Sequence, residues 1–280
     1  MDPEIFLAVI LGALPHAGWN VIVKLNLDRF LAIFLLQCFT GLMGFAMVLA
    51  FPWAQSASLP YALASGALHV GYSLFLVRSY RTGDLSQIYP IARGSAPLIT
   101  AIAAWLGAGE AVSELTAAGI VLLVLGIWLT GMTGSRSLRL DGTTLVFALG
   151  TSGFIAGYTI VDGLGGRASG SASAYAGLVF LLDGLLMTAV GVAIRGRTIF
   201  VLVLPSWKSG LSGAALSVGA YWIVIWAMTK AHIAAVAALR ETSILFVMIM
   251  SITVLKERVT AMRAGGAALI VAGAVALRLG

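Results

Sequence analysis

The sequence predicts an all-α integral membrane protein whose ten transmembrane helices form two inverted five-helix repeats. Of its 280 residues, 60% are hydrophobic and only 10% are charged, whereas a soluble domain usually carries about 25% charged residues. So few polar side chains cannot cover a water-exposed surface, which excludes soluble enzymes. A helix that crosses a bilayer needs about 20 mostly apolar residues, so ten such helices account for most of this chain.

Ten apolar segments follow one another, separated by charges and turn residues. Ten-residue stretches of alternating polarity are absent from the sequence, which excludes an outer-membrane barrel. The connections are short, so we expect consecutive helices to pack as antiparallel neighbours. The segments lie over residues 4–23, 30–52, 60–80, 85–107, 114–132, 143–162, 172–194, 207–230, 233–255 and 260–279.

The two halves of the chain repeat one pattern. Residues 83–129 align with 230–276 without a gap, and the aligned pairs include charged residues and glycines, which rarely match by chance in so apolar a sequence. We therefore divide the chain into 1–135 and 136–280. Five helices per half is an odd number, so the second half crosses the membrane in the opposite sense, as in many secondary transporters. The matched pairs are Arg93 with Arg240, Glu110 with Glu257, Gly119 with Gly266, and Gly126 with Gly273.

The basic residues indicate an orientation rather than a nucleic-acid surface. The net charge is +6, but Lys and Arg are scattered singly and in pairs. Most of them fall in the loops after odd-numbered segments, while the other loops offer Arg167 and Lys230. Because basic loops stay in the cytoplasm, we expect both termini to be periplasmic in a bacterial inner membrane, although Arg278 is an exception. The single cysteine, Cys38, excludes an internal disulfide.

Several short motifs are typical of one transporter family. The stretches GEAV at 109–112 and AGIVL at 118–122 have counterparts in KERV at 256–259 and GGAAL at 265–269, and HAGWN at 16–20 suits the first helix. The chain resembles the drug/metabolite transporter (DMT) superfamily, in particular its EamA-type ten-helix exporters such as the bacterial amino-acid exporters. The resemblance implies a gradient-driven exporter or exchanger of small metabolites. It also implies a central cavity lined by helices 3, 4, 8 and 9, with helices 1 and 6 beside them.

We therefore expect a secondary active transporter that exports small metabolites, chiefly amino acids including aromatic ones, by alternating access. The alternatives are a facilitative channel, or a multidrug or nucleoside exporter of the same fold. The sequence lacks H-E-x-x-H, P-loop and G-x-S-x-G motifs, so we expect no enzymatic activity, cofactor, metal site or ATPase module. The expected partners are a small-molecule substrate, the lipid bilayer and protons as a candidate coupling ion, with no nucleic acid.

Four charged residues lie well inside the predicted helices, away from their ends, where an ionisable side chain is costly and by default a functional candidate. Arg93 and Arg240 can each bind a substrate carboxylate through the planar guanidinium, or satisfy backbone carbonyls. Glu241 can couple protons, bind a substrate amine, or pair with another helix. Asp183 can be protonated and inert, hydrogen-bonded to a neighbour, or part of a proton relay. Gln37 and Thr40 on the matching helix favour a polar contact between the two helices.

Polar and aromatic side chains of several helices suit a cavity for amphipathic metabolites, although each ring alone is equally typical of a packed core. Three residues of the fourth helix interrupt its regular hydrogen bonding and suit a gate: Pro90, Gly94 and Pro97. The complete substrate-binding prediction is His16, Trp19, Asn20, His69, Tyr72, Ser73, Tyr89, Arg93, Tyr158, Tyr221, Arg240 and Ser243.

Overall fold

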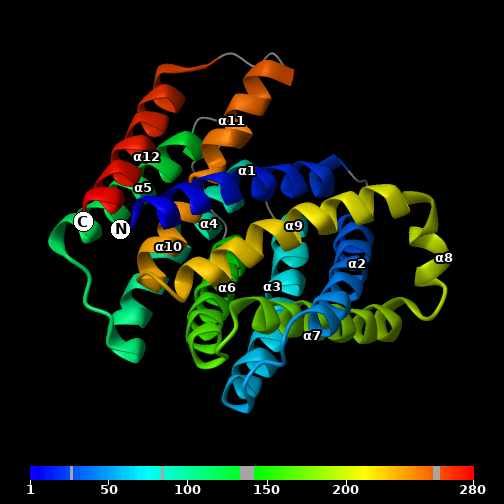
Figure 1. Ribbon diagram of the computed structural model, residues 1–280. Helices are drawn as coiled ribbons and strands as arrows, with labels where there is room; N and C mark the ends of the chain where they lie inside the picture. The colour runs from blue at the N-terminus through cyan, green and yellow to red at the C-terminus, as the bar shows by residue number, and fades with distance from the viewer. Residues whose placement is uncertain (26–27, 83–84, 133–141, 255–258) are drawn as a thin grey trace.

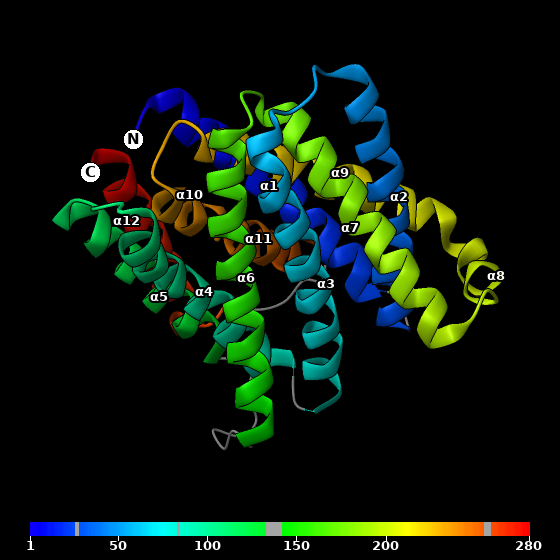
Figure 2. The same cartoon turned by 90° about the horizontal axis from the view of Figure 1, so that it is seen from below.

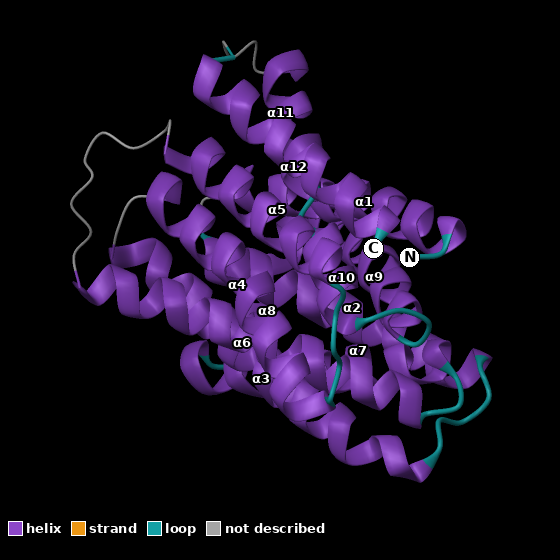
Figure 3. Cartoon of the chain, turned by 90° about the vertical axis from the view of Figure 1, so that its left-hand side faces the viewer, coloured by secondary structure: helices purple, strands orange, loops and turns teal. Residues whose placement is uncertain are grey.

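The computed structural model describes residues 1–25, 28–82, 85–132, 142–254 and 259–280. Within these ranges every regular element is a helix, and no strand occurs (Figure 3). Ten spans are long and apolar enough to cross a membrane, which confirms the predicted all-α fold of ten membrane-spanning helices. Figure 1 shows their arrangement.

The helices follow the predicted segments closely. Their bounds are α1 Pro3–Leu25, α2 Arg29–Ala50, α3 Leu59–Thr82, α4 Leu85–Ala108, α5 Glu114–Met132, α6 Gly142–Ala168, α7 Ala172–Arg195, α8 Ile199–Val203, α9 Trp207–Met228, α10 Ile233–Arg240, α11 Ser243–Val254 and α12 Ala261–Leu279, with short 3-10 turns η1 Ser56–Ser58 and η2 Leu204–Ser206.

Three elements differ from the prediction. The sixth helix continues to Ala168, six residues beyond the expected end at 162. The ninth segment, expected as one helix, is divided into α10 and α11 by a turn at Glu241–Thr242. The fourth helix, in contrast, runs unbroken through Pro90 and Pro97. The expectation that proline would interrupt the fourth helix is therefore wrong, and the interruption lies at the matching depth of the other half.

The expectation that consecutive helices pack together is also wrong for most of the chain. The most extensive contacts join α5 to α12, α2 to α7, α3 to α6 and α1 to α9 (Figure 2). Each of these pairs joins one half of the sequence to the other, and the pairing is compatible with an inverted repeat.

Glycine explains two of these contacts between the halves. A Cβ added at Gly126 of α5 would lie 2.6 Å from the carbonyl oxygen of Gly266 in α12. A Cβ added at Gly184 of α7 would lie 2.8 Å from the carbonyl oxygen of Gln37 in α2. Backbones come this close only where side chains are missing, so these glycines allow the close contacts of α5 with α12 and of α2 with α7.

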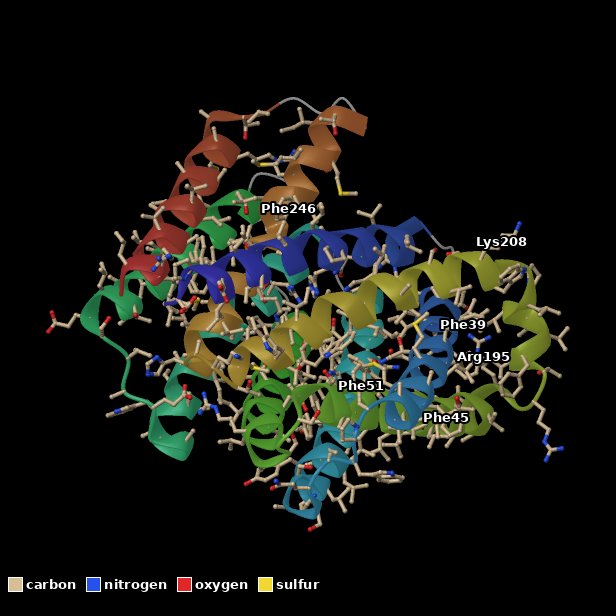
Figure 4. The ribbon with its side chains drawn as sticks, in the orientation of Figure 1. Phe39, Phe45, Phe51, Arg195, Lys208 and Phe246 are labelled. Atoms are coloured by element: carbon tan, nitrogen blue, oxygen red, sulfur yellow. The ribbon has the colours of Figure 1, made fainter. Side chains whose placement is uncertain are left out.

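The two chain ends lie together at one end of the bundle (Figure 1). The Met1 amino group donates to the Arg278 carbonyl oxygen at 3.1 Å, and the Arg278 side chain donates back to the Met1 carbonyl. Arg195 and Lys208 lie on either side of α8, at the end away from the termini (Figure 4). These two basic residues therefore lie at the opposite end of the bundle from the termini.

Candidate functional site

A buried ion-pair cluster forms where α4 meets the interrupted ninth span. Arg93 Nε lies 2.9 Å from Glu241 Oε2, and Arg240 Nε lies 3.5 Å from Glu241 Oε1. These side chains are at most 5% exposed. Adjacent residues within a helix do not face each other, but α10 ends at Arg240, so Glu241 is in a turn and can reach its neighbour. The structure thus brings the matched arginines of the two halves to one carboxylate.

The first helix supplies His16, Trp19 and Asn20. Arg93 Nη2 lies 2.7 Å from His16 Nε2. A guanidinium can only donate, so Nε2 is the acceptor and the neutral ring carries its proton on Nδ1. Trp19 therefore contributes an edge-to-face ring contact, with ring centroids 5.3 Å apart, rather than a hydrogen bond to Nδ1. Asn20 Nδ2 donates to the His16 carbonyl oxygen at 2.7 Å, so it supports α1 itself.

Aromatic side chains of α3, α6 and α9 form the wall beside the arginines. His69 stacks on Tyr158 with ring centroids 4.1 Å apart, and Tyr72 and Tyr221 each place an edge against Tyr158 at 5.8 Å. Arg240 Cζ lies 5.9 Å from the ring centroids of both Tyr158 and Tyr221, within the range of a cation–π contact. These predicted site residues therefore do come together.

A buried carboxylate that the sequence analysis missed extends this network. Asp162 of α6 is fully buried. It accepts a hydrogen bond from the Tyr221 hydroxyl at 2.7 Å and one from the Tyr175 hydroxyl at 3.0 Å. The sequence signal was present, because Asp162 is four residues after Tyr158 and shares its helix face. The expected sixth segment, 143–162, ends at this residue.

Asp183 lies apart from the arginines, in the contact between α2 and α7. Gln37 Nε2 donates to Asp183 Oδ2 at 2.5 Å, which confirms the predicted contact between matching helices. Both side chains are buried. A part for Asp183 in proton coupling stays a prediction.

The structure shows no polar contact with the ion-pair cluster for the remaining predicted residues in the part of the chain that it describes. Tyr89 and Pro90 belong to α4, but their side chains lie outside the described residues. Gly94 faces Trp128 of α5, 2.5 Å from the site of an added Cβ, so it serves close helix packing. Ser73, Pro97 and Ser243 are buried on α3, α4 and α11.

A cavity of about 700 Å³ lies at the terminal end of the bundle, away from this cluster. Its charged and polar lining includes Asp2, Glu110, Arg167, Lys230 and His232. None of the predicted substrate-binding residues lines it. It therefore differs in position from the central cavity that the resemblance implies.

Glu110 and Arg167 join the two halves beside this cavity. Arg167 Nη2 lies 2.5 Å from Glu110 Oε1, and the backbone N–H of Ile233 donates to Glu110 Oε2 at 2.8 Å. Arg167 also donates to the carbonyl oxygens of Met228 and Ala231, each at 2.9 Å. Glu110 thus satisfies the first backbone donor of α10, which has no side-chain cap of its own.

Comparisons with known proteins support this architecture. Residues 142–279 match the EamA-like transporter family. Twenty-nine chains of solved structures match the fold. In one, a protein crystal structure, the match covers 100% of this chain and 99% of the other at 15% identity, with a TM-score of 0.78. A likeness at this identity shows the fold alone. No curated protein matches the chain.

Proposed function

We propose that this chain, which carries an EamA-like transporter domain over residues 142–279, exports amino acids, including aromatic ones, by alternating access. The family acts on small molecules within a membrane and is a family of transporters rather than enzymes. The amino-acid substrate, the export direction and the mechanism are the proposed part. Facilitative channel activity, and export of drugs or nucleosides, are the alternatives that the experiments must separate.

The central cluster is the observation that carries the proposal. Two guanidiniums, Glu241 and a wall of tyrosines meet where helices of both halves pack together. Buried charges are costly in a membrane interior and mark substrate or ion pathways. Tyrosines offer an apolar ring with a polar tip, which suits metabolites that combine a ring with charged groups.

Alternating access is supported by the contacts between the halves. If residues 1–135 and 136–280 form two similar units, they can pack in two equivalent ways that open the central site to either side. We propose that gradients supply the energy, with Glu241 and Asp183 as coupling candidates. Protons are the candidate ion.

Counterflow tests carrier against channel. Proteoliposomes loaded with unlabelled L-phenylalanine should accumulate external radiolabelled L-phenylalanine transiently, and the initial rate should saturate with concentration. A carrier shows this behaviour because it returns with substrate bound. Flux that rises linearly with concentration and shows no counterflow would favour a channel, and counterflow confined to nucleosides or drugs would favour the other exporters.

Cysteine labelling tests the proposed orientation. Ser56 is exposed, and the proposed topology places it on the same side of the membrane as the termini. With Cys38 replaced first, Ser56→Cys should therefore react with an impermeant thiol reagent added to intact bacterial cells. Single cysteines at 136 or 139, which lie outside the described residues, should be shielded until the membrane is permeabilised. The reverse pattern would place the termini in the cytoplasm.

A further inference from the structure

The interruption of the ninth span lies close to the middle of the membrane. The span covers 233–253, α10 ends at Arg240, and α11 begins at Ser243. Proline is absent from this segment of the sequence, and the turn is closed by the Thr242 hydroxyl, which donates to the Leu239 carbonyl oxygen at 2.7 Å. Discontinuous helices in transporters commonly direct the start of the second half-helix toward an anionic substrate group.

Arg240 and Arg93 are not equivalent, although the repeat matches them. Arg93 is engaged through Nε with Glu241 and through Nη2 with His16. The Arg240 side chain is only 3% exposed. Among the described residues its one polar contact is with Glu241, through Nε at 3.5 Å. Its Nη groups have no hydrogen-bond acceptor in the described part of the chain. These donors are available to a ligand.

A second unpaired donor lies three residues later. The Ser243 hydroxyl is at the start of α11, is 1% exposed, and has no hydrogen-bond partner among the described residues. A buried hydroxyl without a partner is costly. The start of a helix carries partial positive charge, and α11 has 12 residues. A guanidinium, a hydroxyl and a helix start together suit a carboxylate, which only accepts hydrogen bonds.

We propose that the turn between α10 and α11 is a carboxylate subsite, in which Arg240 and Ser243 bind the α-carboxylate of a zwitterionic amino acid. The inference rests on the proposed function and names the subsite within it. The rings of Tyr158 and Tyr221 beside Arg240 receive an aromatic side chain. Arg93 is assigned to holding Glu241 and His16, and does not touch the substrate.

Charge balance selects a zwitterion rather than a simple acid or amine. Around the tyrosine wall lie two guanidiniums, of Arg93 and Arg240, and two carboxyl groups, of Glu241 and Asp162. A zwitterion adds no net charge to this site. A lone carboxylate or a lone ammonium would add one net charge to a membrane interior that penalises it.

The test compares three related probes in proteoliposomes: L-phenylalanine, phenethylamine without the carboxylate, and 3-phenylpropionate without the ammonium. In the parental protein, L-phenylalanine should inhibit counterflow at concentrations about ten- to a hundredfold lower than phenethylamine, because a charge-assisted hydrogen bond is lost with the carboxylate. It should also inhibit at lower concentrations than 3-phenylpropionate, because that analogue brings one net charge into the membrane interior. Arg240→Lys, which keeps the charge but loses the fork, should remove most of this preference over phenethylamine.

Ser243→Ala is the variant least prone to disturb folding, because the hydroxyl has no partner among the described residues. It should weaken L-phenylalanine binding roughly five- to tenfold, leave phenethylamine inhibition unchanged, and keep the parental unfolding temperature. Thr40→Val is the matched control, because the Thr40 hydroxyl is also buried and unpaired in the described structure, but on α2, beside the α7 contact. It should leave the preference unchanged.

Two outcomes separate the subsite from the function. If Arg240→Lys and Ser243→Ala both transport L-phenylalanine with the parental preference over phenethylamine, the carboxylate subsite is wrong and the proposed function stands. If the parental protein transports no amino acid in counterflow, the proposed function fails and the amino-acid subsite falls with it.

Discussion

Glu241→Gln should destabilise the protein more than removal of either arginine that contacts it. The substitution keeps the shape of the side chain but leaves Arg93 and Arg240 buried with no carboxylate between them. Breaking a buried ion pair from one side costs about 3–5 kcal/mol, because the remaining charge stays in the interior. Arg93→Gln and Arg240→Gln leave one guanidinium with Glu241, so each should cost less.

Thermal unfolding of the purified variants in detergent measures this order. Asp183→Asn is a suitable control, since it also replaces a buried carboxylate by its amide, but one that faces the Gln37 amide rather than a guanidinium. We expect Asp183→Asn to lower the unfolding temperature less than Glu241→Gln does. If Glu241→Gln unfolds at the parental temperature, the ion pairs of Glu241 with the two arginines do not stabilise the fold. A pH-gradient assay on the same variant shows whether Glu241 also couples protons, because loss of gradient-driven transport with retained exchange is the expected signature.

The ten helices were predictable because the length of each apolar segment can be counted in the sequence. Their partners were not, because the contacts depend on which faces approach closely. Gly126 and Gly184 allow contacts between helices far apart in the chain, and lipid-facing residues elsewhere give no comparable signal. Helix order alone therefore favoured the wrong neighbours for most of the bundle.

The central site was predictable in its residue types and less so in its pairings. Charges within apolar segments identified Arg93, Arg240 and Glu241. The turn after Arg240 lets Glu241 contact both arginines, but it contains no proline from which it could have been predicted. Asp162 shows the opposite error, because the expected sixth segment ends at this charge whereas α6 continues to Ala168. In a membrane helix, a carboxylate four residues after a tyrosine is equally a sign of a polar interior face.

Glu110→Ala should favour opening of the terminal end of the bundle. Glu110 follows α4 in the first half, whereas its partners Arg167 and Ile233 belong to the second half. Movement of one half against the other at this end must break both contacts. A charge-assisted hydrogen bond contributes about 1.5–3 kcal/mol. Its loss should therefore shift the ratio of open to closed states about ten- to a hundredfold.

The shift is measurable at Ala235, which lines the cavity near this link and is 5% exposed. In a background without Cys38, Ala235→Cys should react with an impermeant thiol reagent much faster when Glu110→Ala is added. Glu114→Gln removes an exposed carboxylate from the first turn of α5 and should leave the rate unchanged. An unchanged rate in the Glu110→Ala background would mean that this contact only caps α10, since a link that must break during transport cannot be removed without changing access to the cavity beside it.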